Sequence, residues 1–337
     1  MKVAIIGAGM SGLTTAQQLN ALGYTVDVYD KARGAGGRLT TKRLEWGRSD
    51  IGAQYFTVRD ERFAEQVKQW QLAGVAAEWL FTPYAVNNGV LESSEDNQTR
   101  YIFTPSMGAF TSAFSSDIVP RFSTRIVALH KEMQHWYLSD DTGHSWGGYD
   151  WVVSTLPAEQ SCSLFTRSSG NFDQVLAKIP AQVHQPCWAL TLATTGWVEP
   201  EIQGIFGDDV VSWVSRQSAK PFLSAPEGAE DLWMLHFSAE WSKRFSKQQT
   251  PNAKDIVLQQ GLEWFQRLLG KNLFVQHHHQ HFWRFAKVAP HITENNERIG
   301  NLVDMEQRIA VIGDWCYGGR IEGAFCSASD LTTKFFS

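Results

Sequence analysis

Three glycines close to the N-terminus have the spacing that brings a peptide backbone against a dinucleotide phosphate. They occur in the run Gly7-Ala8-Gly9-Met10-Ser11-Gly12. In this pattern Gly7 permits a tight turn, Gly9 lets the backbone approach a pyrophosphate, and Gly12 lets the next helix pack closely on the strand. The free N–H groups and partial positive charge at that helix end attract phosphate. We therefore expect Met10, Ser11 and the three glycines to contact a dinucleotide cofactor.

An acidic residue and a second glycine-rich segment extend this predicted site. Asp30 follows Gly12 by 18 residues, at the end of the next apolar segment, where its carboxylate can accept hydrogen bonds from ribose hydroxyls. Three glycines and three basic residues come next, in the run Lys31-Ala32-Arg33-Gly34-Ala35-Gly36-Gly37-Arg38. A guanidinium group donates two parallel hydrogen bonds to phosphate. Arg38 is therefore predicted to lie near the pyrophosphate.

A third group of candidate residues lies close to the C-terminus. Residues 308–312 are mostly apolar, as in a strand buried on both faces, and Asp314 follows directly after a glycine. Two more glycines precede a predicted helix that begins near Ile321. We expect Asp314 to bind a cofactor hydroxyl, and we expect the helix N-terminus to stabilise negative charge on the cofactor.

The segments that position these residues alternate strand and helix. Residues 3–6 are a continuous apolar run, and Leu13, Ala16 and Leu19 recur at helical spacing. Residues 26–30 then read as a second strand, which completes a βαβ opening. Because residues 308–312 resemble the first strand, the two ends of the chain are predicted to build one nucleotide-binding domain. The middle of the chain reads as a mixed α+β domain inserted into it.

Composition narrows the class of protein. A chain of 337 residues is long enough for about two domains. With 43% hydrophobic and 19% charged residues it is neither disordered nor a coiled coil. A net charge of −5 disfavours a nucleic-acid binder, and no stretch reaches the roughly 18 apolar residues of a membrane span. Four widely spaced cysteines favour a reducing cytoplasm over a disulfide-bonded protein. We expect neither nucleic acid nor a membrane as partner.

Several of these motifs resemble known flavoproteins. The segment 31–38 is similar to the signature of the monoamine oxidase and phytoene desaturase superfamily. The chain also resembles bacterial renalases, and this resemblance extends along nearly its whole length. It is carried by the runs 50–59 (Asp-Ile-Gly-Ala-Gln-Tyr-Phe-Thr-Val-Arg), 313–316 (Gly-Asp-Trp-Cys) and 319–324 (Gly-Arg-Ile-Glu-Gly-Ala). Where that family has His-Arg-Trp-x-Tyr-Ala, this chain has Phe282 and Phe285 in place of the Arg and the Tyr.

The resemblance implies a fold, a cofactor and a reaction. The fold is an α/β Rossmann-type FAD-binding domain with an inserted α+β substrate domain, as in amine oxidases and p-hydroxybenzoate hydroxylase. The implied boundaries are 1–75, 105–158 and 285–337 for the FAD-binding domain, and 76–104 and 159–284 for the substrate domain. FAD is bound non-covalently. The implied reaction oxidises 2- or 6-dihydro isomers of NAD(P)H to NAD(P)+ by hydride transfer to flavin N5, and O2 then reoxidises the flavin and yields H2O2.

The site residues predicted from the motifs and from the resemblance together fall into two sets. The FAD-contacting set, with the glycine-loop residues above, is Gly7, Gly9, Met10, Ser11, Gly12, Asp30, Lys31, Arg33, Gly37, Arg38, Gln54, Ile126, Asp314 and Ile321. The substrate-side set is Tyr55, Phe56, Thr57, Val58, Arg59, Trp188, His281 and Trp283.

Hydride transfer needs a planar donor held face to face with the flavin and no side-chain nucleophile, so no catalytic acid or base is predicted. A histidine-rich stretch, residues 277–281, invites a metal interpretation, but no metal site is expected because converging ligands and a second shell are not evident. Two alternatives stay open. One is an amine oxidase, for which Lys287 is the best-placed lysine, and the other is a non-catalytic flavin-binding protein.

Overall fold

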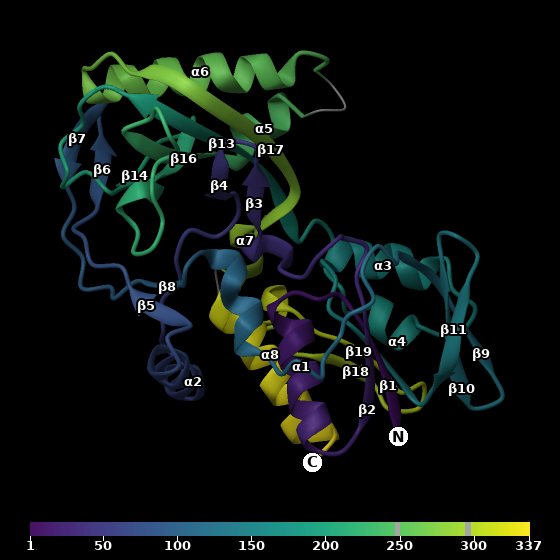
Figure 1. Cartoon of the computed structure of the whole chain (residues 1–337). Coiled ribbons are helices and arrows are strands. Elements are labelled where there is room, and N and C mark those ends of the chain that lie inside the picture. Colours follow the sequence, from purple (N-terminus) through teal and green to yellow (C-terminus); the bar gives the residue numbers. More distant parts are fainter. Residues whose placement is uncertain (247–249, 294–297) are drawn as a thin grey trace.

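The computed structural model describes residues 1–246, 250–293 and 298–337. Its first sheet joins strands from both ends of the chain (Figure 1). The N-terminal strand lies beside the strand that follows it and beside one from the middle of the chain, and all three run parallel. The order across this sheet is β18 (Leu302–Asp304), β19 (Ile309–Val311), β12 (Trp151–Ser154), β1 (Lys2–Ile6) and β2 (Thr25–Tyr29).

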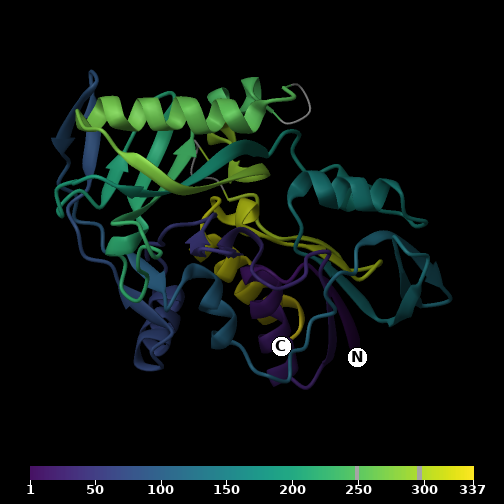
Figure 2. The ribbon, with the colours of Figure 1, turned by 45° about the horizontal axis from the view of Figure 1, so that its top comes forward.

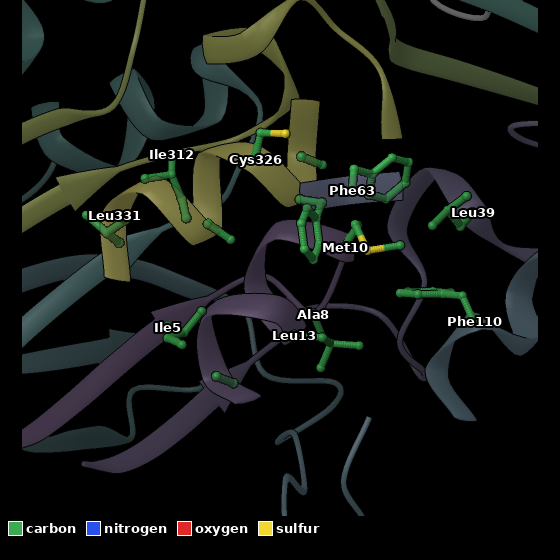
Figure 3. Close-up of a cluster of buried hydrophobic side chains, with 14 of the residues drawn as sticks. Ile5, Ala8, Met10, Leu13, Leu39, Phe63, Phe110, Ile312, Cys326 and Leu331 are labelled. Carbon is green, nitrogen blue, oxygen red and sulfur yellow. The ribbon is translucent and has the colours of Figure 1, made fainter. Parts of the chain in front are cut away.

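Two helices pack side by side against this sheet (Figure 1): α1 (Met10–Ala21), which follows β1 directly, and α8 (Ile321–Phe335). Figure 3 shows Met10 and Leu13 of α1 in one apolar cluster with Cys326 and Leu331 of α8. The same cluster contains Phe63 of α2 (Glu61–Leu72). Because every apolar residue of β1 is buried, the strand that leads into the glycine turn is held on both faces.

A second, seven-stranded sheet forms the other half of the molecule, with a long helix across its outer face (Figures 1 and 2). That helix is α6 (Ala253–Leu269). Neighbouring strands of this second sheet are antiparallel, except for β14 and β6, which run parallel. The order is β17 (Phe274–Val288), β13 (His184–Thr195), β16 (Asp231–Phe237), β15 (Val211–Arg216), β14 (Gly204–Phe206), β6 (Tyr84–Asn87) and β7 (Val90–Ser93).

Smaller elements connect the two sheets. A hairpin of β3 (Thr41–Leu44) and β4 (Gly47–Asp50) leads from the glycine-rich segment toward the second sheet, where Ser49 and Thr191 exchange a buried hydrogen bond of 2.8 Å. The other elements are β5 (Ala76–Glu78) with β8 (Tyr101–Phe103), β9 (Ile126–Glu132), β10 (His135–Asp140), β11 (Ser145–Tyr149), α3 (Ala158–Thr166), α4 (Asp173–Leu176), α5 (Ala239–Arg244) and α7 (Pro290–Thr293). No helix of the described residues is long and apolar enough to cross a membrane.

The pairing of strands shows where the apolar runs of the sequence lie in the fold. The continuous apolar runs at residues 3–6 and 308–312 become neighbours of the same strand, β12, in the parallel sheet. The strands of the second sheet come almost entirely from the middle of the chain. The boundaries drawn between the two domains from the sequence stay a prediction.

Candidate functional site

The glycine turn between β1 and α1 is as tight as its sequence requires. Gly7 has φ +115°, and a Cβ there would lie 2.4 Å from Thr155 Oγ1. A Cβ on Gly12 would lie 1.9 Å from the carbonyl oxygen of Gly7, so helix and turn touch through backbone. A Cβ on Gly9 would meet no atom within 4 Å, and no side chain caps the first turn of α1. The turn therefore presents free N–H groups to open space.

Asp30 is fixed beside this turn. Its carboxylate accepts a hydrogen bond of 2.7 Å from the backbone N–H of Ala8 and one of 2.8 Å from the N–H of Ala32. Each carboxylate oxygen can accept a further hydrogen bond, since an ionised carboxylate has about four acceptor positions. The residue is therefore oriented by the loop and still able to bind a hydroxyl.

A cavity of about 1530 Å³ lies between the two sheets and begins at the glycine turn. Most of the predicted residues line it. On the cofactor side these are Gly7, Gly9, Met10, Ser11, Asp30, Lys31, Gly37, Arg38, Gln54, Ile126, Asp314 and Ile321. On the substrate side they are Tyr55, Phe56, Thr57, Arg59, His281 and Trp283.

Four predicted residues are not among the described residues that line this cavity. Gly12 lies behind the turn, and Arg33 and Val58 are also outside the lining. Trp188 is fully buried in the core of the second sheet, where its Nε1 donates to the carbonyl of Phe245 at 2.8 Å. Phe282 packs on the Trp188 ring at 5.0 Å between centroids, whereas Phe285 lines the cavity. Only one of the two departures from the family pattern therefore bears on the cavity.

Arg38 and Asp314 form a bidentate ion pair in the lining of the cavity. Arg38 NH1 lies 2.9 Å from one carboxylate oxygen of Asp314, and NH2 lies 2.5 Å from the other. Arg38 comes from the second glycine-rich segment and Asp314 from the turn after β19. Two groups predicted separately to contact a cofactor are thus held at one place.

The end of the cavity that the predicted substrate-side residues line is aromatic and contains a buried guanidinium. Tyr55 lies 5.3 Å from Trp213, and Trp213 lies 5.0 Å from Phe206. Arg100 lies 5.3 Å from the Tyr55 ring and is only 3% exposed, and it pairs with Asp96. Burial raises the pKa of the Tyr55 phenol, although Arg100 opposes the shift. The phenol is therefore neutral at neutral pH and available to hydrogen-bond.

Two rings, from the strands on either side of β13, approach the backbone of Ile51, which also lines the cavity. Trp283 Nε1 donates to the Ile51 carbonyl at 2.8 Å, and His236 Nε2 lies 3.4 Å from the same oxygen. Burial, and next the charge of Lys287, lower the pKa of His236 to about 3. His236 is therefore neutral at pH 7, and its Nε2 carries the proton because a carbonyl only accepts.

The histidine-rich strand and the cysteines do not form metal or redox centres among the described residues. No cluster of three potential metal ligands occurs in the described part of the chain, and His277 instead stacks on Trp46 at 5.2 Å. All four cysteines are free thiols. Burial raises the pKa of Cys187 to about 11 and that of Cys316 well above its usual value. Neither thiol is an active nucleophile at neutral pH.

The cavity is much more basic than the whole protein. Ten cationic side chains line it, against four acidic ones, Asp30, Asp96, Glu159 and Asp314. The cationic residues are Lys31, Arg38, Lys42, Arg59, Arg100, Arg125, Arg167, Arg284, Lys287 and Arg320. The chain as a whole carries a net charge of −5. The excess of positive charge is thus concentrated where a ligand would bind.

Several lining residues carry no signal that sequence reasoning detects. Thr155 follows β12, and its hydroxyl lies against the glycine turn. Trp213 and His236 come from strands of the second sheet, Arg100 directly precedes β8, and none of the three belongs to a motif. Only the pairing of strands far apart in the chain brings them to the cavity.

The first part of the chain matches a known family model. Residues 5–70 match the model of an NAD(P)-binding Rossmann-like domain. A stretch of 59 residues, 16% of this chain, is 41% identical to Protein FLOWERING LOCUS D of Arabidopsis thaliana. The matched stretch spans 8% of the length of that relative. The match supports the nucleotide-binding assignment of the N-terminal segment.

Solved structures with a similar fold cover almost the whole chain. A protein from Exiguobacterium sp. 255-15 assigned as a protoporphyrinogen oxidase aligns with a TM-score of 0.74 at 11% identity, over 98% of each chain. Reduced UDP-galactopyranose mutase gives 0.76 at 13% identity, over 100% of this chain and 94% of the other. A fatty acid isomerase from P. acnes gives 0.69 at 12% identity, over 99% and 98%. The expected α/β two-domain fold with a Rossmann-like domain is confirmed.

Proposed function

We propose that this chain is an FAD-dependent oxidase that converts 2- or 6-dihydro isomers of NAD(P)H to NAD(P)+. The observation that carries the proposal is the large, basic cavity. Its volume of about 1530 Å³ exceeds the roughly 300–1,000 Å³ of a site for one small ligand. It therefore has room for a dinucleotide cofactor and a second ligand. Ten cationic side chains suit two ligands that both carry a pyrophosphate.

The residues at the glycine turn fit FAD. Gly9 leaves space where a pyrophosphate approaches the backbone, and the uncapped first turn of α1 supplies N–H donors. Asp30 keeps acceptor positions for ribose hydroxyls, and the Arg38–Asp314 pair offers both a donor fork and acceptor oxygens. Cys316 is buried with a raised pKa, which supports non-covalent binding over a thioether link.

FAD supplies the hydride acceptor and the route of electrons to O2. The chain's own residues then have to hold a nicotinamide ring flat, keep water out and bind the phosphates. Tyr55, Phe206 and Trp213 form an aromatic wall on one side of the cavity, and Trp283 is fixed by its bond to Ile51. His236 stays neutral and adds no charge beside the reacting ring. No side chain has to give or take a proton.

The phosphates of the second ligand need cations away from the glycine turn. Arg59 and Arg100 lie at the aromatic end of the cavity, and Arg59 NH2 lies 3.5 Å from Gln98 Oε1. Arg59 is exposed and free to turn toward a ligand, whereas both terminal nitrogens of Arg100 donate to Asp96. We assign substrate phosphate binding to Arg59 and a supporting role in the cavity wall to Arg100.

Oxidation of amines is the second candidate function, because Lys287 is one of the lysines that line the cavity. Lys287 Nζ lies 3.3 Å from Ser212 Oγ, close to the aromatic wall. Protonated amines carry positive charge, so a lining with ten cationic and four acidic side chains repels them. The charge of the cavity therefore favours the dinucleotide reaction over amine oxidation.

The proposal is tested by mixing the flavin-loaded protein without oxygen with four candidates in turn: 2-dihydro-NAD, 6-dihydro-NAD, ordinary NADH and a polyamine. We expect the visible flavin absorbance to bleach fastest with one of the two isomers. Bleaching by the polyamine alone favours the amine oxidase. A flavin that none of the four reduces supports a non-catalytic flavin-binding protein.

A further inference from the structure

A buried ion pair lies directly behind the wall of the cavity. Lys220 Nζ lies 3.1 Å from Asp50 Oδ2, and the two side chains are 2% and 1% exposed. Lys220 follows a short 3₁₀ turn between β15 and β16 of the second sheet, whereas Asp50 ends β4. Buried lysines are rare because desolvation disfavours the ammonium, and burial lowers the pKa of Lys220. Such a pair is expected to be retained for a specific purpose.

The pair holds one end of the segment 50–54. The other oxygen of Asp50 accepts from Thr41 Oγ1 at 2.6 Å and from the N–H of Met107 at 3.1 Å. The Asp50 backbone N–H donates to Gln217 at 3.0 Å, and Gln217 donates back to the Asp50 carbonyl at 2.7 Å. The carboxylate, its backbone and the lysine are therefore all fixed relative to one another.

Gln54 holds the other end, and both polar atoms of its side-chain amide are engaged within the protein. Its Oε1 accepts from Lys220 Nζ at 3.0 Å, Ser215 Oγ at 2.7 Å and Gln217 Nε2 at 3.1 Å. Its Nε2 donates to the carbonyls of Asp50 and Gly52. The amide thus works as a cross-link within the protein. The cofactor contact assigned to Gln54 by resemblance is therefore left to its backbone or to the hydrocarbon part of its side chain.

The middle of the segment 50–54 contacts the backbone of Arg38, whose guanidinium lies on the cofactor side of the cavity. The N–H of Ala53 donates to the Arg38 carbonyl at 3.0 Å. A Cβ on Gly52 would lie 2.0 Å from that same oxygen, so the two backbones are in direct contact. The Arg38 side chain in turn pairs with Asp314 in the cavity. A continuous set of contacts therefore runs from Lys220 to the guanidinium of Arg38.

We propose that Lys220 is a positioning residue: through Asp50 and Gln54 it fixes the segment 50–54 against Arg38 and so sets where the Arg38 guanidinium stands relative to the cofactor. Lys220 touches neither ligand. The cofactor part of this inference rests on the proposed function, whereas the fixing of the segment does not.

The test uses three variants and a control in the full chain. Lys220→Met removes the buried ammonium, Asp50→Asn keeps the acceptor for Thr41 but removes the charge, and the double variant removes both charges. Because breaking one half of a buried pair leaves an unpaired charge, the double variant is the one expected to fold with native stability. Lys271→Met is the matched control, since Lys271 pairs with Glu199 at the surface of the same half.

Two readouts are compared. We expect Lys220→Met and the double variant to bind FAD at least about tenfold more weakly, which is the loss for one weakened charge-assisted hydrogen bond. We also expect hydrogen exchange at the Ala53 amide to rise at least about tenfold without any cofactor. Lys271→Met should change neither.

The outcomes separate the two proposals. Native FAD affinity and native exchange at Ala53 in the double variant overturn the positioning proposal. A wild-type chain that takes up no flavin contradicts the proposed function, and the Ala53 exchange then decides the positioning proposal alone. Faster exchange with unchanged FAD affinity overturns the link to the cofactor.

Discussion

His236 gives the most quantitative test of the structure around the cavity. It is 7% exposed on β16, and within the described part of the chain its imidazole hydrogen-bonds to the carbonyl of Ile51. Burial, and next Lys287 and more weakly Lys220, hold its pKa at about 3, against an ordinary value of 6.5. In the unfolded chain the imidazole takes up a proton near pH 6.5, whereas the folded chain does not until about pH 3. Replacement by Gln removes this titration and keeps a donor for Ile51.

The sign and the size of the effect follow from linkage. Between about pH 6.5 and pH 3 the unfolded state binds more protons, so His236 lowers the stability of the folded protein as the pH falls. At pH 5 an ordinary histidine is almost fully protonated when unfolded. The free energy of unfolding is therefore expected to drop by about 2 kcal/mol more in the wild type than in His236→Gln between pH 7 and pH 5. This figure depends little on the exact folded pKa, provided that it lies well below 5.

The assay is urea unfolding at the two pH values, followed by tryptophan fluorescence. His135→Gln is the control, because the His135 side chain is half exposed beside Asp150. The reasoning is refuted if wild type and His236→Gln lose the same stability between pH 7 and pH 5. Such a result would mean that the imidazole is charged in the folded protein, and the neutral site beside Ile51 would be wrong.

Three further substitutions test separate parts of the account. Gly12→Ala places a Cβ 1.9 Å from the Gly7 carbonyl and should weaken FAD binding at least about tenfold in a fluorescence titration, whereas Gly34→Ala, with no atom within 4 Å, should not. Lys287→Met should raise KM for the dihydro isomers by no more than about fivefold and leave kcat unchanged, because a partly exposed charge contributes little to binding. A large fall in kcat would instead favour the amine oxidase. Trp188→Phe should lower the free energy of unfolding by about 1–3 kcal/mol through the lost bond to Phe245, with KM unchanged; an altered KM would place Trp188 in the site.

The sequence could predict best which residues around the glycine turn line the cavity. These residues are local: the glycine turn, Asp30 and Arg38 lie within 32 residues of one another, and each demands a backbone geometry or a charge that few other residues supply. Asp314 was found because a strand and a glycine precede it. The structure adds that Asp314 and Arg38 are partners, which no spacing reveals.

The substrate side was harder to predict because long-range strand pairing builds it. Trp188 and Phe282 are aromatic residues on strands beside the cavity, yet they face the core because side chains alternate along a strand. His236 and Trp213 reach the cavity from strands with no distinctive pattern. Gln54 lies where it was expected, but its polar atoms are occupied by Lys220, Ser215 and Gln217, which come from a segment more than 160 residues away.

The central claim is that an isoalloxazine cofactor binds between the glycine turn and the second sheet. Titration of the purified, gently prepared protein with FAD measures this directly. The account predicts one FAD for each chain, a yellow protein, and release of the intact cofactor when the protein is denatured. A colourless protein that takes up no added FAD would contradict the account.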